Sequence, residues 1–150
     1  MGYDKEKVGT VVLGVIGSDI HSIGNRIMEY ALKEEGFNVI NLGVQVPLEE
    51  FIKAAIESNA DAILIGSLYG HAMMDCEGIR DKCIEAGLGD IILYIGGNLT
   101  TDYTKPWEEI EQTFKAMGFD RVFRSGVLPS EVIKVLREDI RKRRERRGKC

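Results

Sequence analysis

Cysteine and histidine, the usual ligands of structural metal sites, are scarce in this sequence. It contains three cysteines and two histidines, and no two cysteines have the CxxC spacing of zinc or redox motifs. Combining the histidines with Asp75 and Cys76 gives spacings that match no common zinc pattern. The sequence therefore argues against a zinc site, and the small, odd number of cysteines indicates reduced thiols in the cytoplasm.

Long apolar runs are also absent. No stretch reaches the roughly 18 apolar residues that a membrane-spanning helix requires. Residues 1–7 are too charged and contain too few apolar residues for a signal peptide. We therefore expect a cytoplasmic protein without a membrane partner.

Positive charge is concentrated at the carboxyl end of the chain. Residues 141–150 hold seven basic residues and one acidic residue, although the whole chain has a net charge of −4. Residues 1–140 are therefore acidic, which argues against a nucleic-acid partner. We predict one domain over residues 1–140 and a basic C-terminal tail over residues 141–150. The favoured interpretation of the tail is a solvated helix end, and contact with RNA or a membrane is the alternative.

Apolar, strand-like segments alternate with helix-like segments along the domain. The predicted strands are residues 8–17, 37–43, 61–66, 90–97 and 119–123. A helix is predicted after each strand, and three of these helices begin at Pro47, Pro106 and Pro129. The pattern predicts an α/β fold with a single doubly wound, five-stranded parallel sheet of the flavodoxin-like or Rossmann-like type.

Apolar residues at helical spacing predict the side of each helix that faces the sheet. These residues are Ile23, Ile27, Tyr30 and Ala31 in the first helix, Phe51, Ile52, Ala55 and Ile56 in the second, Cys76, Ile79, Cys83 and Ile84 in the third, Trp107, Ile110, Phe114 and Met117 in the fourth, and Ile133, Leu136 and Ile140 in the last.

Ligands of doubly wound folds bind beyond the carboxyl ends of the strands. The loops expected there are residues 17–22, 66–75, 96–105 and 124–129. Gly96 and Gly97 form either a simple turn or a surface against which a ligand lies. Tyr69, His71, Met73 and Met74 form an apolar and polarisable group after the third strand. We interpret this group as part of a surface loop or of a subunit contact.

The first of these loops contains Asp19 and His21, two residues apart. An aspartate that accepts the Nδ1–H of a histidine leaves Nε2 free as a metal ligand. The alternative is that Asp19 caps the following helix and His21 is a polar loop residue. The loop lacks the GxGxxG fingerprint of dinucleotide-binding folds. Gly66 and Ser67 stand where a receiver domain would have an aspartate.

Three elements in this order are similar to a known pattern. Asp19-x-His21-x-x-Gly24, then Gly66-Ser67-Leu68, then Gly96-Gly97 resembles the DxHxxG…SxL…GG pattern of cobalamin (B12)-binding domains. Within that group the chain most resembles the small (sigma) subunits of glutamate mutase, or methylaspartate mutase. The stretches GVIGSDIHSIGNRI, SLYGHAMMDCEGIRDKCIEAGL and FKAMGFDRVF carry this similarity, which covers residues 8–140.

The resemblance implies that adenosylcobalamin binds in the base-off, His-on mode. His21 would be the axial cobalt ligand, and Asp19 would bond the other nitrogen of its ring. The nucleotide tail of the cofactor would enter a slot between the first helix and the sheet. The implied cofactor-binding residues are Ser18, Asp19, His21, Ser22, Ile23, Gly24, Gly66, Ser67, Leu68, Tyr69, Gly96, Gly97, Asn98, Phe123 and Gly126.

The sequence departs from the family pattern at three places. Gly66 stands where the family has the serine of SxL, and Phe123 stands where a tyrosine is frequent. Residues 124–127 replace a proline-containing Gly-Thr turn. These changes affect the polar contacts to the nucleotide tail and leave the cobalt ligand in place.

The resemblance also implies a function and a partner. The expected reaction interconverts L-glutamate and (2S,3S)-3-methylaspartate, in a heterotetramer with a larger TIM-barrel subunit that binds most of the substrate. The chain would be inactive alone and would hold no catalytic residue beyond the cobalt ligand. The alternatives are the B12-binding subunit of another carbon-skeleton mutase and a free-standing corrinoid carrier protein.

Overall fold

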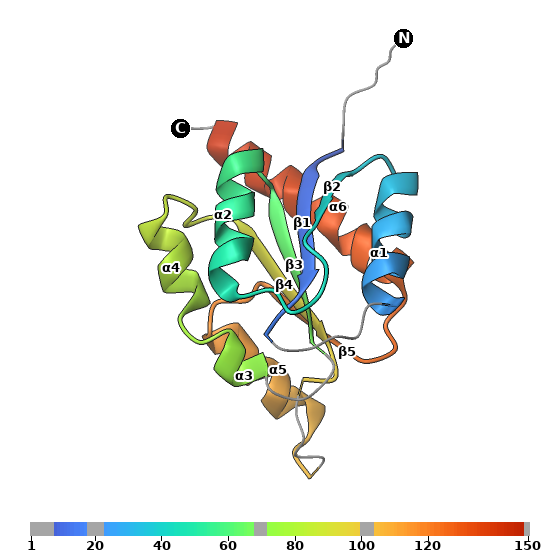
Figure 1. The fold of residues 1–150 in the computed structure, drawn as a ribbon, viewed down its shortest axis with the longest axis vertical. Coiled ribbons are helices and arrows are strands. Elements are labelled where there is room, and N and C mark those ends of the chain that lie inside the picture. The colour runs from blue at the N-terminus through green and yellow to red at the C-terminus, as the bar shows by residue number, and fades with distance from the viewer. Residues whose placement is uncertain (1–7, 18–22, 68–71, 100–103, 149–150) are drawn as a thin grey trace.

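The computed structural model describes residues 8–17, 23–67, 72–99 and 104–148. Its centre is a parallel sheet with the strand order β2-β1-β3-β4-β5, and helices cover both faces (Figure 1). The strands are β1 (Thr10–Val15), β2 (Asn38–Asn41), β3 (Ala62–Ser67), β4 (Ile92–Gly97) and β5 (Arg121–Arg124). The predicted doubly wound sheet is therefore confirmed.

The helices of the described residues follow the strands in alternation. They are α1 (Ile23–Glu34), α2 (Leu48–Ser58), α3 (Ala72–Asp75), α4 (Ile79–Glu85), α5 (Trp107–Ala116) and α6 (Pro129–Gly148). The prediction of one continuous helix from Cys76 is wrong, because Cys76 lies between α3 and α4. Gly78, with φ +78°, occupies the left-handed region directly before α4, and this conformation interrupts a right-handed helix.

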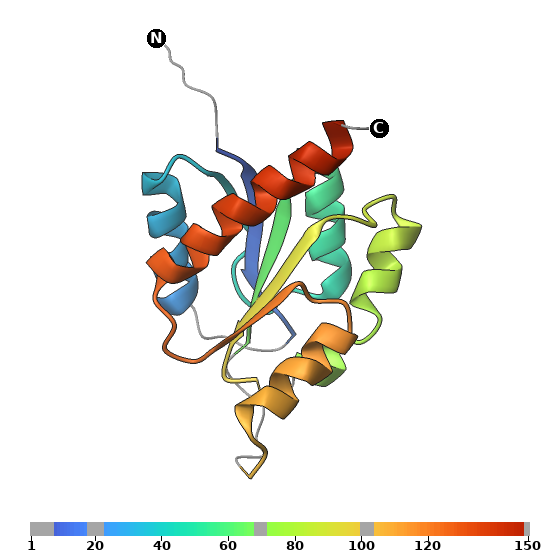
Figure 2. The ribbon, with the colours of Figure 1, turned by 180° about the vertical axis from the view of Figure 1, so that it is seen from behind.

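The two faces of the sheet have separate hydrophobic cores. Side chains alternate between the faces along each strand, so Leu13 and Leu64 pack beneath α1 and α6, whereas Val12 and Ile63 pack against the other helices. Figure 2 shows α6 crossing the first of these faces, with α1 at one edge of the sheet. A cavity lies between α1, α6 and the sheet on this face.

The predicted helix faces are correct for α5 and α6 and only partly correct elsewhere. In α5, Phe114 is buried, and Trp107, Ile110 and Met117 pack against the same core. Ile133, Leu136 and Ile140 are buried as predicted. Ile56 and Ile84, in contrast, are about half exposed, because each lies one residue beyond the stripe that contacts the sheet. These two predictions are wrong.

The sheet-facing side of α1 also differs from the predicted stripe. Met28, Ala31 and Leu32 pack against the core on the α1 side, whereas Ile27 and Tyr30 are exposed. Residues at i, i+3 and i+4 share a helix face, so the methionine, the alanine and the leucine form that face. Of the predicted stripe, Ala31 packs inward as expected.

The basic segment after residue 140 continues α6 as far as Gly148. Most of its side chains are exposed, but Arg143 is buried among acidic groups at the amino ends of β3 and β4. The interpretation of a solvated helix end is therefore wrong for this residue. The division into a domain and a tail at residue 140 stays a prediction. Across the described part of the chain, each helix is too short or too polar to span a bilayer.

Candidate functional site

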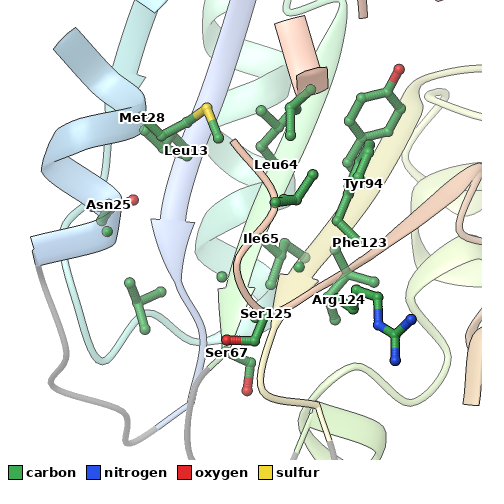
Figure 3. A pocket seen from close by; sticks show the side chains of 18 of the residues that line it. Leu13, Asn25, Met28, Leu64, Ile65, Ser67, Tyr94, Phe123, Arg124 and Ser125 are labelled. Atoms are coloured by element: carbon green, nitrogen blue, oxygen red, sulfur yellow. The ribbon is translucent and has the colours of Figure 1, made fainter. Parts of the chain in front are cut away.

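A slot opens at the carboxyl edge of the sheet, between α1 and the turn that follows β5. Its cavity has a volume of about 200 Å³, and Figure 3 shows the side chains around it. The predicted site residues that line it are Gly24, Gly66, Ser67, Gly96, Gly97, Phe123 and Gly126. Residues from four separate stretches of the sequence thus meet at one place, as the sequence predicts.

Strand register brings the glycines together. Gly66 of β3 pairs with Val15 of β1 on one side and with Gly96 of β4 on the other. Gly96 in turn pairs with Phe123 of β5. The floor of the slot is therefore a row of neighbouring residues on four strands, namely Val15, Gly66, Gly96 and Phe123. The two glycines of this row have no side chain.

The glycines leave room for a ligand in different ways. A Cβ atom on Gly24 would meet nothing within 4 Å, and a Cβ atom on Gly66 would have its nearest neighbour, the Gly14 carbonyl oxygen, at 3.7 Å. Side chains at these positions would therefore occupy the slot. At Gly96 the Cβ atom would lie only 3.3 Å from Cβ of Phe123, so this glycine allows Phe123 to approach the sheet.

The walls of the slot are apolar. Leu13 and Leu64 project from the sheet, Met28 projects from α1, and Figure 3 places the Tyr94 and Phe123 rings on the opposite side. These two rings pack edge to face with centroids 5.3 Å apart. The arrangement suits a flat apolar group, since aromatic rings favour such contacts.

The hydroxyl group of Tyr94 is engaged away from the slot. It donates a hydrogen bond to Asp139 of α6, and Nε of Arg121 donates to the same carboxylate at 2.7 Å. Burial and the neighbouring Asp139 raise the pKa of Tyr94. Burial tends to raise the pKa of Asp139, but the hydrogen bonds from Arg121 and Tyr94 outweigh it and lower that pKa. The phenol stays protonated and joins β4 to α6.

A second polar network positions α1. Nδ2 of Asn25 donates to Oδ1 of Asn41 at 2.7 Å, and Nδ2 of Asn41 donates to Glu29 at 2.9 Å. The backbone N–H of Gly43 also donates to Oδ1 of Asn41. These bonds connect the first turns of α1 to the end of β2 and so fix one wall of the slot.

Ser67 borders the slot, but its side chain does not form part of the floor. Strand alternation directs its side chain to the face opposite Gly66. The residue is fully buried, and Oγ has no hydrogen-bond partner among the described residues. A buried hydroxyl group without a partner is unusual.

Of the remaining predicted site residues, Asn98 follows β4 and does not line the cavity. Ile23 is the first residue of α1, and its side chain lies outside the described part of the chain. Ser18, Asp19, His21, Ser22, Leu68 and Tyr69 lie outside the described residues. The prediction that His21 binds cobalt therefore stays a prediction.

No other metal site is found in the part of the chain that the structure describes. It contains no group of three histidine, cysteine or acidic side chains that could hold a metal ion. Cys76 and Cys83 are both buried. Burial raises the pKa of Cys76 to about 12, so this thiol is protonated at neutral pH and is a poor metal ligand.

The apolar walls of the slot were not predicted from the sequence, although the sequence contains a signal for them. Leu64 and Tyr94 each lie two residues before a slot glycine on the same strand, and alternation places them on the same face. Met28 lies four residues after Gly24, which is one helical turn. Counting two residues along the strand from Gly66 and Gly96, and four residues along the helix from Gly24, therefore predicts all three wall residues.

Comparison with known proteins gives a consistent family. A family model described as the B12 binding domain matches residues 9–134. The glutamate mutase sigma subunit of Carboxydothermus hydrogenoformans is 58% identical over 130 residues, which cover 87% of this chain and 94% of that protein. The glutamate mutase sigma subunit of Clostridium cochlearium is 53% identical over 131 residues, which cover 87% of this chain and 95% of that protein.

A solved structure shares the fold. It is the crystal structure of a cobalamin-binding protein from Desulfitobacterium hafniense, which matches with a TM-score of 0.69 at 22% identity. The match covers 87% of this chain and 58% of that protein, so this chain spans little more than half of its length. The likeness agrees with the observed sheet and helix arrangement.

Proposed function

Because the chain belongs to the B12-binding domain family, and within it to the glutamate mutase sigma subunits, we propose that it is the cobalamin-binding subunit of an adenosylcobalamin-dependent glutamate mutase. The reaction interconverts L-glutamate and (2S,3S)-3-methylaspartate. A larger TIM-barrel subunit binds the amino acid, and the two kinds of subunit form a heterotetramer. Without that partner the chain is inactive, because its own residues bind only the cofactor.

The observation that carries this proposal is the glycine-floored apolar slot. An apolar cavity of about 150 Å³ accommodates a benzene molecule, so a cavity of about 200 Å³ suits a slightly larger aromatic ring system. The benzimidazole at the end of the cobalamin tail is such a group. Side chains at Gly24 or Gly66 would occupy the same space. The residues present therefore fit the tail of the cofactor.

The bound cofactor would also need a protein ligand for its cobalt. We assign this role to His21, and Asp19 would accept the N–H of the other nitrogen of the histidine ring. A carboxylate in that position fixes the tautomer of a ligating histidine and increases its basicity. When bound, adenosylcobalamin supplies the radical chemistry, and the protein supplies binding and orientation.

The departures from the family pattern remove polar contacts to the cofactor tail but leave apolar ones. Gly66 contributes no hydroxyl group, and Phe123 contributes none either. Phe123 instead packs against Tyr94, which adds apolar surface to the wall. The tail is therefore held mainly by apolar contact, which is worth about 25 cal/mol for each Å² removed from water.

Retention of the cofactor and activity with a partner test the proposal. The purified chain is mixed with cobalamin, desalted and examined by visible spectroscopy, and it is then combined with the barrel subunit, adenosylcobalamin and L-glutamate. We expect bound cobalamin with a base-off spectrum, and formation of 3-methylaspartate only in the combined sample. Methyl transfer from methylcobalamin without isomerisation would instead identify a corrinoid carrier.

Two leucine variants provide the structural control. Gly66→Leu fills the slot and should abolish cobalamin retention. Gly89→Leu introduces the same side chain into an exposed turn before β4, where its nearest neighbour is a side-chain atom of Ile84 at 3.6 Å, and it should retain cobalamin as the unchanged chain does. Equal retention by both variants would contradict the assignment of the slot.

A further inference from the structure

Residues 18–22, which carry the proposed cobalt ligand, connect the end of β1 to the start of α1. Backbone hydrogen bonds fix the β1 side of this connection. The N–H of Val15 donates to the carbonyl oxygen of Gly43 at 2.9 Å, and the N–H of Gly17 donates to the carbonyl oxygen of Val46 at 2.9 Å. The position of this side therefore depends on the backbone that follows β2.

A side chain, that of Asn41, connects the α1 side to the same stretch of backbone. Nδ2 of Asn25, in the first turn of α1, donates to Oδ1 of Asn41 at 2.7 Å. The apolar contacts of α1 with the sheet come from later in the helix, at Met28, Ala31 and Leu32. The bond between the two asparagines therefore places the start of the helix relative to the end of β2.

The neighbours of Asn41 determine which way its amide group faces. The backbone N–H of Gly43 donates to Oδ1 at 2.9 Å, and Nδ2 donates to the carboxylate of Glu29 at 2.9 Å. A backbone N–H can only donate, and an ionised carboxylate can only accept. The oxygen of Asn41 is therefore directed toward Gly43, where it also accepts the bond from Asn25.

Asn41 thus contacts both elements that residues 18–22 connect. It pairs with Leu13 of β1 in the sheet register, and its side chain bonds two residues of α1. Because the connection is short, a shift of α1 relative to β1 changes the distance that the connection has to span. We propose that Asn41 is a positioning residue for the cobalt ligand His21, because it sets the separation of these two ends. This inference rests on the proposed function.

Four variants of the full chain separate this role from a general effect on stability. Asn41→Leu keeps a side chain of similar size and removes all three bonds, and Asn25→Ala breaks the connection from the helix side without altering the turn after β2. In the double variant Asn41→Asp with Glu29→Gln, the carboxylate accepts from Asn25, from Gly43 and from the new amide at position 29, so the bonds are restored with one donor and acceptor exchanged. Arg143→Ala lowers stability at the opposite edge of the sheet.

EPR of bound Co(II) cobalamin reads the ligand directly. Each chain is produced with histidine labelled with the heavy nitrogen isotope, equilibrium dialysis gives the dissociation constant for cobalamin, and urea unfolding gives the stability. We expect the doublet from a histidine ligand to disappear from most of the bound cobalamin in Asn41→Leu and in Asn25→Ala. The dissociation constant should rise about tenfold, since contacts that orient a metal ligand contribute at least that much to affinity. The double variant and Arg143→Ala should both keep the doublet.

The contrary results are distinguishable. A full doublet in Asn41→Leu and Asn25→Ala, whatever their dissociation constants, would overturn the inference and leave the proposed function intact, because the asparagines would then shape only the slot wall. Loss of the doublet in the double variant, or an equal loss in Arg143→Ala, would also overturn the inference. Failure of the unchanged chain to bind cobalamin would overturn the proposed function together with the inference.

Discussion

Arg143 shows how a single residue can differ from the segment that contains it. Its side chain is only 5% exposed, although its neighbours in sequence form a charged run. Nη1 of Arg143 donates to Asp61 at 3.2 Å, and Nε donates to the backbone carbonyl of Asp90 at 3.1 Å. Asp61 also accepts the backbone N–H of Thr10 at 2.9 Å. The arginine therefore joins α6 to the amino ends of β1, β3 and β4.

Replacing this arginine should destabilise the fold. Arg143→Ala leaves the buried carboxylate of Asp61 with fewer donors, and breaking a buried ion pair costs about 3 kcal/mol of unfolding free energy. Urea unfolding followed by circular dichroism measures the change. Arg141→Ala is the matched control, because Arg141 pairs with Glu138 and Glu145 on the exposed side of the same helix and its loss should matter much less. Equal losses would contradict the structural role of Arg143.

At the scale of elements, α6 is connected to the sheet through Asp139. Its carboxylate accepts bonds from Tyr94 of β4 and Arg121 of β5. The same tyrosine ring forms a wall of the slot. The ionised carboxylate of Asp139 therefore contributes to the position of α6 and to the shape of the slot.

The ionisation of Asp139 predicts a pH-dependent contribution to stability. Its pKa in the folded chain lies below the ordinary value of 3.8, so its contribution is complete above that value and disappears as the pH falls through the folded pKa. Asp139→Asn should lower the unfolding free energy by about 2 kcal/mol at neutral pH. The difference from the unchanged chain should shrink as the pH falls below 3.8 and through the folded pKa of Asp139.

Urea unfolding at a series of pH values measures this difference. Glu138→Gln removes the same charge from a neighbouring position on α6, where the carboxylate bonds the exposed Arg141 and Lys142 side chains, and it should have a smaller effect. A loss for Asp139→Asn that stays constant down to the acidic limit would show that the carboxylate charge is not what stabilises this junction.

At the scale of the whole molecule, the fold and the slot floor could be predicted because they follow short-range rules. Apolar runs, glycine stops and helix-starting prolines place the strands and helices along the chain. A parallel sheet then brings all strand ends to one edge. Gly66 and Gly96 meet there for that reason, and they lie beside each other in the register.

The remaining features depend on contacts between distant segments. The burial of Arg143 depends on acidic residues at positions 61 and 90, and no local pattern distinguishes it from the other arginines of α6. The outward side of α1 depends on which of two apolar stripes reaches the sheet, and both contain residues at helical spacing. Helix periodicity alone does not decide between them.

The most direct measurement concerns the lower ligand of cobalt. The chain is produced with and without histidine labelled with the heavy nitrogen isotope, loaded with unlabelled cobalamin, reduced to Co(II) and examined by EPR. If His21 binds cobalt, the nitrogen splitting changes from a triplet to a doublet on labelling and disappears in His21→Gly. A triplet that persists in the labelled chain would come from the cofactor's own benzimidazole and would contradict His-on binding.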